Sequence, residues 1–578
     1  MSERRLNLHP QSRVDRLVED GQWTPETIDG MFRATAARRG DALAIVDPAN
    51  RAALAGGAAR RLTWREVDSE VTALAARLAE AGVSRGDTIG VQLANGIELT
   101  EMLVAAWTLG ATVSPLAMQY RDHEITTMGN AAEFDWVVAA RAFGERHPAD
   151  DFARLRGELP SVRGVFSYGL PDDALCEDST GVTHLFPTSA TTADEAAVAA
   201  YRAADPNDPN DCVTICWTSG TEGVPKGVMR AHYDWLVFSM VCQDASATTT
   251  DDVILNAFPM INMAGICAML LPWVRTGCVL VQHHPFDAPT FFGQIARERV
   301  TYTLAPPALL SMLLHNEELL SRIDLTSLTR IGSGSAPLNP AMVRGWQERF
   351  EIPIINFFGS NEGVGLLSSS VDLPSPDDRA RFFPRYGAEG TDWSMQLSKW
   401  ADVKIYDLET GDEITEPGRP GELHISGPQL FARYLNAETL SNPFDEAGYL
   451  KTGDIFEIAG DEGQYLRYVD RAKDIIIRGG MNIAPVELET LIMKHPAVAD
   501  VAVVGDLDET LGEKVAAFVA LHPETTLDLP ELVEFLREQH IASYKLPENL
   551  RVVELLPRNP VGKVVKTELR KVLAEAQA

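Results

Sequence analysis

The sequence has few cysteines, few positive charges and no long apolar runs. Six cysteines in 578 residues are too few for a disulfide framework and none forms a CxxC pair, so we expect reduced, mostly buried thiols. Acidic residues outnumber Lys and Arg by 82 to 51, a net charge of −31, which argues against binding to nucleic acid or anionic lipid. No run reaches the roughly 18 apolar residues of a membrane span, and the N-terminus lacks the apolar core of a signal peptide. We therefore expect a cytoplasmic protein without an integral membrane segment.

Two familiar nucleotide-binding motifs are also missing. No GxxxxGK(S/T) loop occurs, and the sequence GSGSAP at residues 332–337 fails the GxGxxG pattern at its last position. Neither a Walker loop nor a Rossmann fingerprint is therefore indicated. The adjacent His283 and His284 could suggest a metal site, but we interpret them as a surface feature.

The N-terminal part reads as alternating helices and strands. Thr63 and Glu66 have capping-box spacing, and the apolar stripe that follows runs to Gly82, a residue typical of a helix end. Strands are predicted before and after a helix at 98–109, which favours α/β layers with a mainly parallel sheet. Residues 169–211, rich in Asp, Ala, Thr and Pro, are predicted to be a surface excursion with little regular structure.

The C-terminal part has a different pattern. Strands are predicted at 498–506, 513–522 and 549–554, with a helix at 528–540 that Asp528 would cap. A charged VDRAKD segment separates this unit from the rest of the chain. We therefore predict an α/β fold class, with a large N-terminal α/β domain of several subdomains at residues 1–470 and a small α+β C-terminal domain at 471–578.

A candidate phosphate-binding loop follows a short predicted strand at residues 213–217. The loop, TSGTEGVPKG at 218–227, combines glycines, hydroxyls and Lys226. Glycines let backbone amides converge on an anion, hydroxyls donate hydrogen bonds and the lysine adds positive charge. A polar turn is the alternative. The acidic balance of the chain does not conflict with this site, because an anion site needs only local amides and a few cations.

Six segments, in order along the chain, resemble the motifs of the AMP-forming adenylating enzyme superfamily, and most of all its acyl-CoA ligases. They are TSGTEGVPKGV at 218–228, GSGSAPL at 332–338, FFGSNEG at 357–363, YLKTGD at 449–454, DRAKDIIIRGGMNIAPVELE at 470–489 and PRNPVGK at 557–563. The resemblance implies a mobile C-terminal domain that carries the catalytic lysine. It also implies ATP, Mg²⁺ and CoA: MgATP and a carboxylate give acyl-AMP and pyrophosphate, and a thiol then displaces AMP.

The resemblance assigns the catalytic roles to three residues. Lys563 would supply positive charge where the carboxylate meets the α-phosphate, Glu362 would bind Mg²⁺, and Arg471 would contact ribose or phosphate. Asp454 would accept hydrogen bonds from the ribose hydroxyls. The implied ATP- and AMP-binding residues are Thr218, Ser219, Gly220, Thr221, Gly223, Lys226, Ser335, Ala336, Pro337, Phe358, Gly359, Asn361, Asp454 and Arg471.

Further positions concern domain motion and the two other substrates. Lys473 matches the family's hinge, and Gly479 and Gly480 would line the tunnel for CoA. FPMINMAG at 258–265 resembles the family's acyl-pocket segment LPxFHxxG, and its apolar character suggests a hydrophobic carboxylic acid, with cyclic and aromatic acids among the candidates. The implied substrate-pocket residues are Phe258, Met260, Ile261, Asn262, Met263, Gly265, Gly332, Gly334, Phe357 and Gly363.

Four positions depart from the family pattern. Glu222 puts negative charge near the expected phosphates, and Asn361 replaces a Thr but keeps a donor for phosphate. Phe358 replaces a Tyr and keeps a stacking face, and Asp470 stands where Gly usually precedes the arginine. These changes affect contact details more than the reaction class.

Two alternatives to a CoA ligase stay open. A stand-alone adenylation enzyme would load a carrier-protein phosphopantetheine, although this chain has no carrier domain of its own. A non-catalytic nucleotide-binding protein with a decayed site is the other, and the retained Lys563, Asp454, Glu362 and Arg471 argue against it. The partners expected are a small carboxylic acid, ATP and CoA, with no nucleic acid, and a homodimer is compatible with the sequence.

Overall fold

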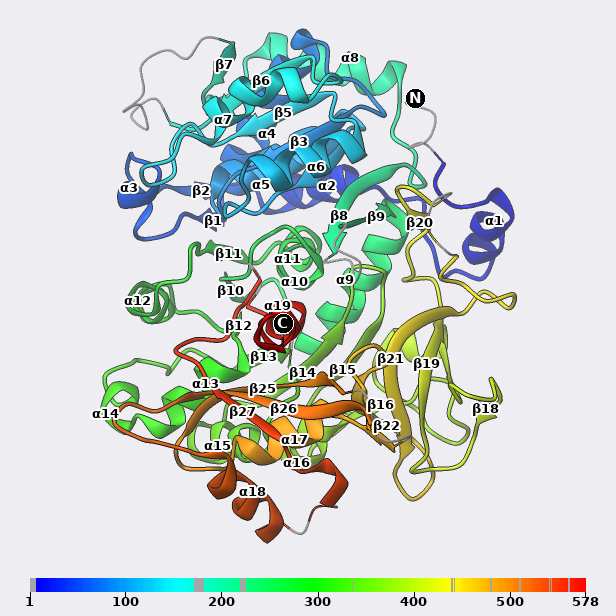
Figure 1. Cartoon of the computed structure of the whole chain (residues 1–578). Coiled ribbons are helices and arrows are strands. Elements are labelled where there is room, and N and C mark those ends of the chain that lie inside the picture. Colours follow the sequence, from blue (N-terminus) through cyan, green and yellow to red (C-terminus); the bar gives the residue numbers. More distant parts are fainter. Residues whose placement is uncertain are drawn as a thin grey trace.

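The computed structural model describes residues 7–170, 181–218, 225–334, 336–437, 440, 442–478, 481–508, 511–539, 541, 543–559 and 562–577. A large N-terminal domain and a small C-terminal domain can be followed in Figure 1, where colour runs from blue at the N-terminus to red at the C-terminus. The described residues form four sheets, three in the large domain and one in the small domain.

The first eight-stranded sheet occupies the blue and cyan upper part of Figure 1. Its order is β20-β9-β8-β4-β3-β5-β6-β7; β8 to β7 are parallel, while β9 and β20 are antiparallel additions. The strands are β3 (Thr88–Gln92), β4 (Thr112–Pro115), β5 (Trp136–Ala139), β6 (Gly164–Tyr168), β7 (Val182–Leu185), β8 (Cys212–Thr218), β9 (Lys226–Ala231) and β20 (Arg433–Tyr434).

The second eight-stranded sheet lies below the first and has the order β15-β14-β13-β12-β10-β11-β1-β2. Its inner six strands are parallel, and β15 and β2 pair antiparallel at the edges. The strands are β1 (Leu43–Val46), β2 (Arg61–Thr63), β10 (Val253–Asn256), β11 (Val279–Gln282), β12 (Tyr302–Leu304), β13 (Arg330–Gly334), β14 (Ile354–Gly359) and β15 (Gly365–Ser368).

Helices fill the space between these two sheets and cover their outer faces, so the layers alternate. The largest hydrophobic core lies between the sheets and contains the indoles of Trp64, Trp235 and Trp273. The helices between the sheets are α2 (Ile28–Arg39), α4 (Trp64–Ala81), α5 (Ile97–Thr108), α9 (His232–Ser246), α10 (Met263–Gly265), the π-turn Ile266–Leu270 and α11 (Leu271–Thr276).

Two smaller cores lie on the outer faces of the sheets. The helices there are α6 (Asp122–Ala132) and α7 (Pro148–Leu155) on the first sheet, and α12 (Ala288–Glu298), α13 (Pro307–His315), α14 (Glu317–Leu320), α15 (Pro340–Phe350) and α16 (Pro376–Arg381) on the second. The capping box at Thr63 and Glu66 is present at the start of α4, and Gly82 ends this helix in the left-handed conformation. These local predictions are confirmed.

The third sheet of the large domain is antiparallel, with the order β16-β22-β21-β19-β17-β18. Its strands are β16 (Phe382–Pro384), β17 (Asp402–Tyr406), β18 (Glu413–Ile414), β19 (Pro420–Ser426), β21 (Leu450–Ala459) and β22 (Tyr465–Arg471). The yellow strands of Figure 1 show it at the lower right.

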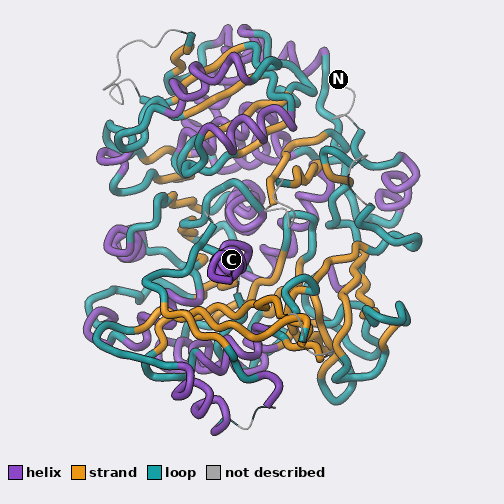
Figure 2. The backbone as a smooth tube through the Cα atoms, viewed as in Figure 1, coloured by secondary structure: helices purple, strands orange, loops and turns teal. Residues whose placement is uncertain are grey.

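The small domain has a five-stranded sheet covered by helices, and its strands run across the lower half of the view in Figure 2. The strands are β23 (Ile476–Arg478), β24 (Met481–Ile483), β25 (Val498–Asp508), β26 (Gly512–Leu521) and β27 (Asn549–Val552), and the helices are α17 (Pro485–Ile492), α18 (Leu529–Glu538) and α19 (Lys566–Gln577). Asp528 caps α18 as predicted. The predicted boundary at residue 470 falls where β22 ends and the chain turns toward β23.

The prediction of little structure at 169–211 was wrong for part of the segment. Beside β7 it contains α8 (Thr192–Ala204), which begins with a second capping box, formed by Thr191 and Asp194. The remaining part, 171–180, lies outside the described residues. α8 packs on α4, so the polar composition reflects a helix with one face in solvent.

The thiols agree with the expectation of reduced, buried cysteines. Cys212, Cys216, Cys242, Cys267 and Cys278, the five in the described part of the chain, are free and buried. Among the helices that the structure describes, none combines the length and the apolar character needed to cross a membrane.

Candidate active site

Three sheets meet where the sequence motifs converge. The β8–β9 hairpin of the first sheet pairs Thr218 with Lys226, and Figure 1 shows it reaching down toward α9 and β20. The loop that it carries, at residues 219–224, lies outside the described residues. In the second sheet β13 and β14 are parallel neighbours, so the motif residues that follow them lie at one edge. The carboxyl edge of a parallel sheet is a common place for ligands.

A cluster of Glu362, Tyr434 and Lys226 forms one arm of the site. The Tyr434 hydroxyl donates a hydrogen bond to Glu362 Oε1 at 3.0 Å, and the backbone N–H of Phe431 donates to the Glu362 carbonyl at 2.9 Å. Lys226 Nζ lies 5.4 Å from the centre of the Tyr434 ring. Burial, with the Glu362 carboxylate second, raises the pKa of Tyr434 well above its usual value, so this phenol stays a donor. The Glu362 carboxylate is half-buried, and the Tyr434 hydroxyl fixes one of its oxygens. Such a carboxylate suits Mg²⁺, which prefers carboxylate oxygen as a ligand.

Asn361 connects this arm to the predicted acyl segment. Its Oδ1 accepts a hydrogen bond from the backbone N–H of Met263 at 3.0 Å, and its Nδ2 donates to the carbonyl of Trp217 at 3.4 Å. The expectation that this amide donates to phosphate stays a prediction. In the structure the side chain joins the acyl segment, the segment that carries Glu362 and the end of β8.

The second arm is an ion pair on adjacent antiparallel strands. Asp454 on β21 faces Arg471 on β22, with 2.7 Å between Asp454 Oδ1 and Arg471 Nε. Asp454 is only 2% exposed, and burial raises the pKa of its carboxyl. The charges of Arg471 and Lys563 oppose that rise and the charge of Glu362 adds to it. Arg471, Lys563 and Glu362 therefore all lie close enough to Asp454 to act on its carboxyl electrostatically.

Lys563 stands on a tight hairpin of the small domain. Its backbone N–H donates to Asn559 Oδ1 at 2.9 Å, and its carbonyl accepts from the Asn559 N–H at 2.8 Å. Water still reaches its side chain, yet enough protein surrounds the ammonium that desolvation lowers its pKa to about 8, with Arg471 the next cause. Asp454 and Asp474 work in the other direction.

Several contacts cross the predicted hinge. Asp470, buried at the end of β22, accepts hydrogen bonds from the N–H groups of Arg471 at 2.7 Å and Val486 at 2.9 Å. Asp470 thus connects the third sheet to the first turn of α17. Lys473 lies exposed in the turn that follows β22. Desolvation and the charge of Arg471 lower the pKa of Lys473, while Asp474 opposes them.

The remaining nucleotide-site predictions are placed as follows. Phe358 lies half-buried on β14, 5.3 Å from Tyr468 and 5.1 Å from Phe456 between ring centres, and Gly359 is exposed at the end of that strand. Ala336 and Pro337 are exposed just after β13. Outside the described residues are Ser219, Gly220, Thr221, Glu222, Gly223, Ser335, Gly479 and Gly480.

The predicted pocket residues divide into buried and half-buried groups. Met260 is fully buried in the main core, whereas Phe258, Ile261, Asn262 and Met263 are half-buried. Gly265 packs against the backbone of Pro259 and Met260 within the acyl segment, whereas Gly332 and Gly334 on β13 pack against Phe357 of the neighbouring strand β14. Gly363 has φ +105°, and an added Cβ would lie 2.4 Å from the carbonyl oxygen of Gln429. Glycine is needed at 363 so that two backbones can touch.

Two residues at this site were missed by the motif comparison. Tyr434, on β20, holds Glu362, and Arg230, on β9, donates to the carbonyl oxygens of Asn361 and Gln429. Their partners lie 72 to 199 residues away in sequence, so no local pattern showed them. Arg230 at the end of β9 and Asp234 in the first turn of α9 are four residues apart, and this spacing was the one local signal for their ion pair.

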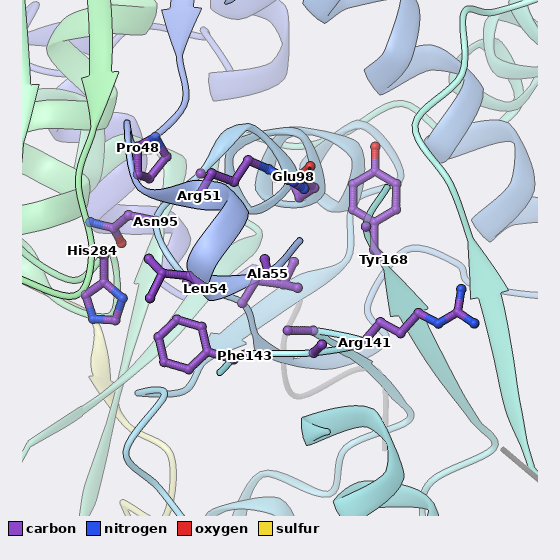
Figure 3. A pocket seen from close by; sticks show the side chains of 16 residues that line it. Pro48, Arg51, Leu54, Ala55, Asn95, Glu98, Arg141, Phe143, Tyr168 and His284 are labelled. Atoms are coloured by element: carbon purple, nitrogen blue, oxygen red, sulfur yellow. Dashed lines mark hydrogen bonds and ion pairs between the residues drawn. The ribbon is translucent and has the colours of Figure 1, made fainter. Parts of the chain in front are cut away.

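A separate pocket lies behind the acyl segment, close to His283 and His284. The prediction that these two histidines lie at the surface was wrong. Both histidines are buried, not at the surface. Figure 3 shows His284 beside Phe143 and Asn95 at the rim of this pocket, whose open space is about 50 Å³, enough for a few water molecules. Asn95 separates it from the acyl segment by donating to the Phe258 carbonyl at 2.8 Å and accepting from the Met260 N–H at 3.1 Å. Among the described residues no cluster of metal ligands is found.

Comparison with protein families gives two matches in chain order. Residues 32–435 match the model of the AMP-binding enzyme family, and residues 487–563 match its AMP-binding enzyme C-terminal domain. The first match includes the β8–β9 hairpin and Glu362, and the second ends at Lys563.

Similar proteins are ligases that join acids to CoA. A 4-coumarate–CoA ligase from Pinus taeda is 31% identical over 92% of this chain and 93% of its own. A Mycobacterium tuberculosis ligase, named for a methyl-dioxo-octahydroindenyl propanoyl group, is 32% identical over 88% of this chain and 94% of its own. The fold matches that of ATP-bound MatB from Rhodopseudomonas palustris with a TM-score of 0.74 at 23% identity, covering 96% of this chain and all of that one. The chain therefore belongs to the AMP-binding enzyme family and is an AMP-forming ligase of its acyl-CoA ligase branch.

Proposed function

We propose that the enzyme joins a hydrophobic carboxylic acid, cyclic or aromatic, to CoA through an acyl-adenylate. We infer a hydrophobic substrate from the position of the apolar segment at residues 258–265. Its Met263 N–H is bound by Asn361, the residue next to Glu362, so a bound acid would lie against Phe258, Ile261 and Met263 close to the metal-binding arm. The names of two relatives, which are ligases for an aromatic and a bicyclic acid, support the same class.

In the first half-reaction a carboxylate oxygen of the acid attacks the α-phosphorus of ATP and pyrophosphate leaves. Two anions must approach each other, so positive charge at their meeting point lowers the barrier. Lys563 would supply it, since its ammonium is retained below its pKa of about 8. Asp454, fixed by Arg471, would accept hydrogen bonds from the ribose hydroxyls, and Lys226 would face the outer phosphates.

Bound Mg²⁺ would neutralise phosphate charge and help pyrophosphate to leave. Glu362 would hold it through carboxylate oxygen, while the Tyr434 hydroxyl keeps that carboxylate in one orientation. The arrangement fits a hard cation.

In the second half-reaction the thiol of CoA attacks the acyl carbonyl carbon, the bond to the phosphate oxygen breaks and AMP leaves with that oxygen. Lys563 is not needed here, and we propose that the small domain turns about Lys473 so that Gly479 and Gly480 replace it at the site. Asp470 would act at the same boundary, because it lies on β22 of the large domain and accepts a hydrogen bond from the N–H of Val486 in the small domain.

A panel of acids tests the proposal. Pyrophosphate release would be measured with cinnamate, benzoate, cyclohexanecarboxylate, octanoate and malonate, each with and without CoA. We expect release that depends on the acid, is greatest with a cyclic or aromatic acid, and is accompanied by a CoA thioester.

Each other outcome has a distinct meaning. Preference for malonate would contradict the hydrophobic pocket. Adenylate formation without any thioester would contradict CoA as the acceptor and favour a carrier protein. No acid-dependent release with any member of a broad panel would favour a decayed site.

A further inference from the structure

The segment at residues 427–430, between β19 and β20, is held by an unusual number of side chains. The carbonyl of Gln429 accepts from Arg230 Nη2 at 2.5 Å, and the carbonyl of Pro428 accepts from Trp23 Nε1 at 3.0 Å. The carbonyls of Gly427 and Leu430 accept from Arg13 Nη2 at 3.1 Å and 3.4 Å. All four consecutive carbonyls are thus bound by side chains from elsewhere in the chain.

This segment supports the metal-binding glutamate directly. The next N–H, that of Phe431, donates to the carbonyl of Glu362, and Tyr434 donates to its carboxylate. On the other side Gly363 touches Gln429 so closely that a Cβ would not fit. Any shift of residues 427–430 would therefore move Glu362.

Arg230 joins the two backbones that meet here. One guanidinium nitrogen donates to the Asn361 carbonyl at 3.0 Å, while another donates to Gln429. Its Nε donates to Asp234 Oδ1 at 2.6 Å, and the whole side chain is excluded from solvent. Since an arginine presents several donors in a rigid plane, it fixes the distance between two loops better than a lysine can.

The N-terminal residues complete this arrangement. His9 Nε2 lies 3.0 Å from Asp234 Oδ2, and both side chains have no exposure. Burial lowers the pKa of His9, so the neutral ring donates from Nε2 to the carboxylate that pairs with Arg230. His9 also packs against Trp23, which stacks on Tyr233 of α9 with ring centres 4.5 Å apart. Residues 7–23 lie before the region that matches the family model.

We propose that Arg230 is a positioning residue for Glu362. Residues 7–23 hold Arg230 in place through the contact of His9 with Asp234, and they also bind residues 427–430 directly through Arg13 and Trp23. The role rests on the proposed function, because it concerns the Mg²⁺ that Glu362 would bind. It assigns to the N-terminal segment a part in the metal dependence of the enzyme.

The test compares two fully buried arginines. Arg379, on α16, is also excluded from solvent and donates to backbone carbonyls, those of Ile354 and Leu373, so its contacts are at the start of β14 and not at Glu362. The full-length variants Arg230→Lys and Arg379→Lys would be compared in the Mg²⁺ concentration that gives half-maximal pyrophosphate release, with thermal melting measured in parallel. We expect both to melt earlier, but only Arg230→Lys to need more Mg²⁺, by about tenfold, because hydrogen bonds from a charged group are lost.

A second pair of variants, at His9, keeps the proposal testable if Arg230→Lys does not fold. His9→Phe keeps the ring contact with Trp23 but removes the donor to Asp234, whereas His9→Gln keeps a donor. We expect His9→Phe to raise the half-maximal Mg²⁺ concentration by about threefold and His9→Gln to stay near wild type. Unchanged Mg²⁺ dependence in folded Arg230→Lys and His9→Phe would overturn the proposal.

Failure of the proposed function would look different. Titration of wild type with ATP at a series of Mg²⁺ concentrations, followed by tryptophan fluorescence without any acid, measures the metal dependence of nucleotide binding alone. If wild type binds MgATP but turns over no acid, the proposed reaction fails while the same variants still test the role of Arg230. If Arg230→Lys and wild type give the same titration, the positioning role fails.

Discussion

The two arms of the site are built in opposite ways. In the fixed arm, Glu362 is held by Tyr434 and by the backbone at Phe431, all within the large domain. In the junction arm, Asp454 pairs with Arg471 on β22, and the charge of Lys563, on a hairpin of the small domain, acts on the Asp454 carboxyl by lowering its pKa. The fixed arm is supported by side chains from distant segments, whereas the hairpin is closed by its own contacts, such as that between Lys563 and Asn559.

This difference matches the order of the chemistry. A metal and phosphate site must be rigid, because small displacements weaken electrostatic stabilisation of the transition state. A lysine that acts in only one half-reaction, as we propose for Lys563, is best carried on a unit that would keep its shape if the small domain turned. The contrast predicts that the two arms respond differently to substitution.

The largest effect is expected for Lys563→Ala. Loss of the ammonium should lower acid-dependent pyrophosphate release by about 100- to 1000-fold, the usual result of removing one group that stabilises transition-state charge. Lys514, whose ammonium pairs with Asp508 elsewhere in the small domain, offers a control, and Lys514→Ala should stay near wild type. Equal losses in the two variants would mean that the small domain, not Lys563, is what matters.

A smaller effect is expected for Asp454→Asn. The change removes the carboxylate that holds Arg471 and would accept from ribose, so KM for ATP should rise by about 10- to 100-fold. Glu457 on the same strand pairs with Arg467, so Glu457→Gln is the matched loss of charge and should leave KM unchanged. An unaltered KM for ATP in Asp454→Asn would remove Asp454 from the nucleotide site.

Lys473→Pro tests the junction between the domains and leaves the proposed catalytic side chains unchanged. Proline fixes φ in the turn, so domain rotation should be impaired and thioester formation should fall by about tenfold more than adenylation, about 1.4 kcal/mol in barrier height. Lys473→Ala separates loss of charge from loss of rotation and should affect both steps alike. A Lys473→Pro enzyme with an unchanged ratio of the two steps would count against the hinge.

The pH dependence should show the smallest effect. The pKa of Lys563 is lowered to about 8, so its ammonium is present below that pH and is lost above it. The value of kcat/KM for adenylation should therefore be about half its plateau near pH 8 and fall further at higher pH. In Lys563→Arg the fall should disappear from this range, since a guanidinium keeps its proton. A fall that persists in Lys563→Arg would assign it to another group.

Sequence reasoning was most successful where signals are local. The capping box at Thr63, the cap at Asp528 and the strands of the small domain depend on residues within a few positions of each other. The motif order likewise led to Glu362 and Asp454, which the structure brings into electrostatic contact. The capping pair at Thr191 carried the same signal as that at Thr63 and was outweighed by the polar composition around it.

It was least successful where partners are distant. Burial of His283 depends on Gln294, whose side chain lies 2.7 Å from its ring, and on the packing of α12 above them. Arg230 contacts carbonyls more than a hundred residues away, and Tyr434 reaches Glu362 across two sheets. These contacts follow from how the sheets are stacked, and nothing in the neighbouring sequence specifies them.

The most direct test measures both half-reactions in Lys563→Ala. Adenylation would be followed by acid-dependent pyrophosphate release, and thioester formation by CoA consumption from a supplied acyl-adenylate of the preferred acid. If Lys563 acts only in adenylation, pyrophosphate release should fall by about 100-fold or more while thioester formation stays within about threefold of wild type. Equal losses in both half-reactions would contradict this role.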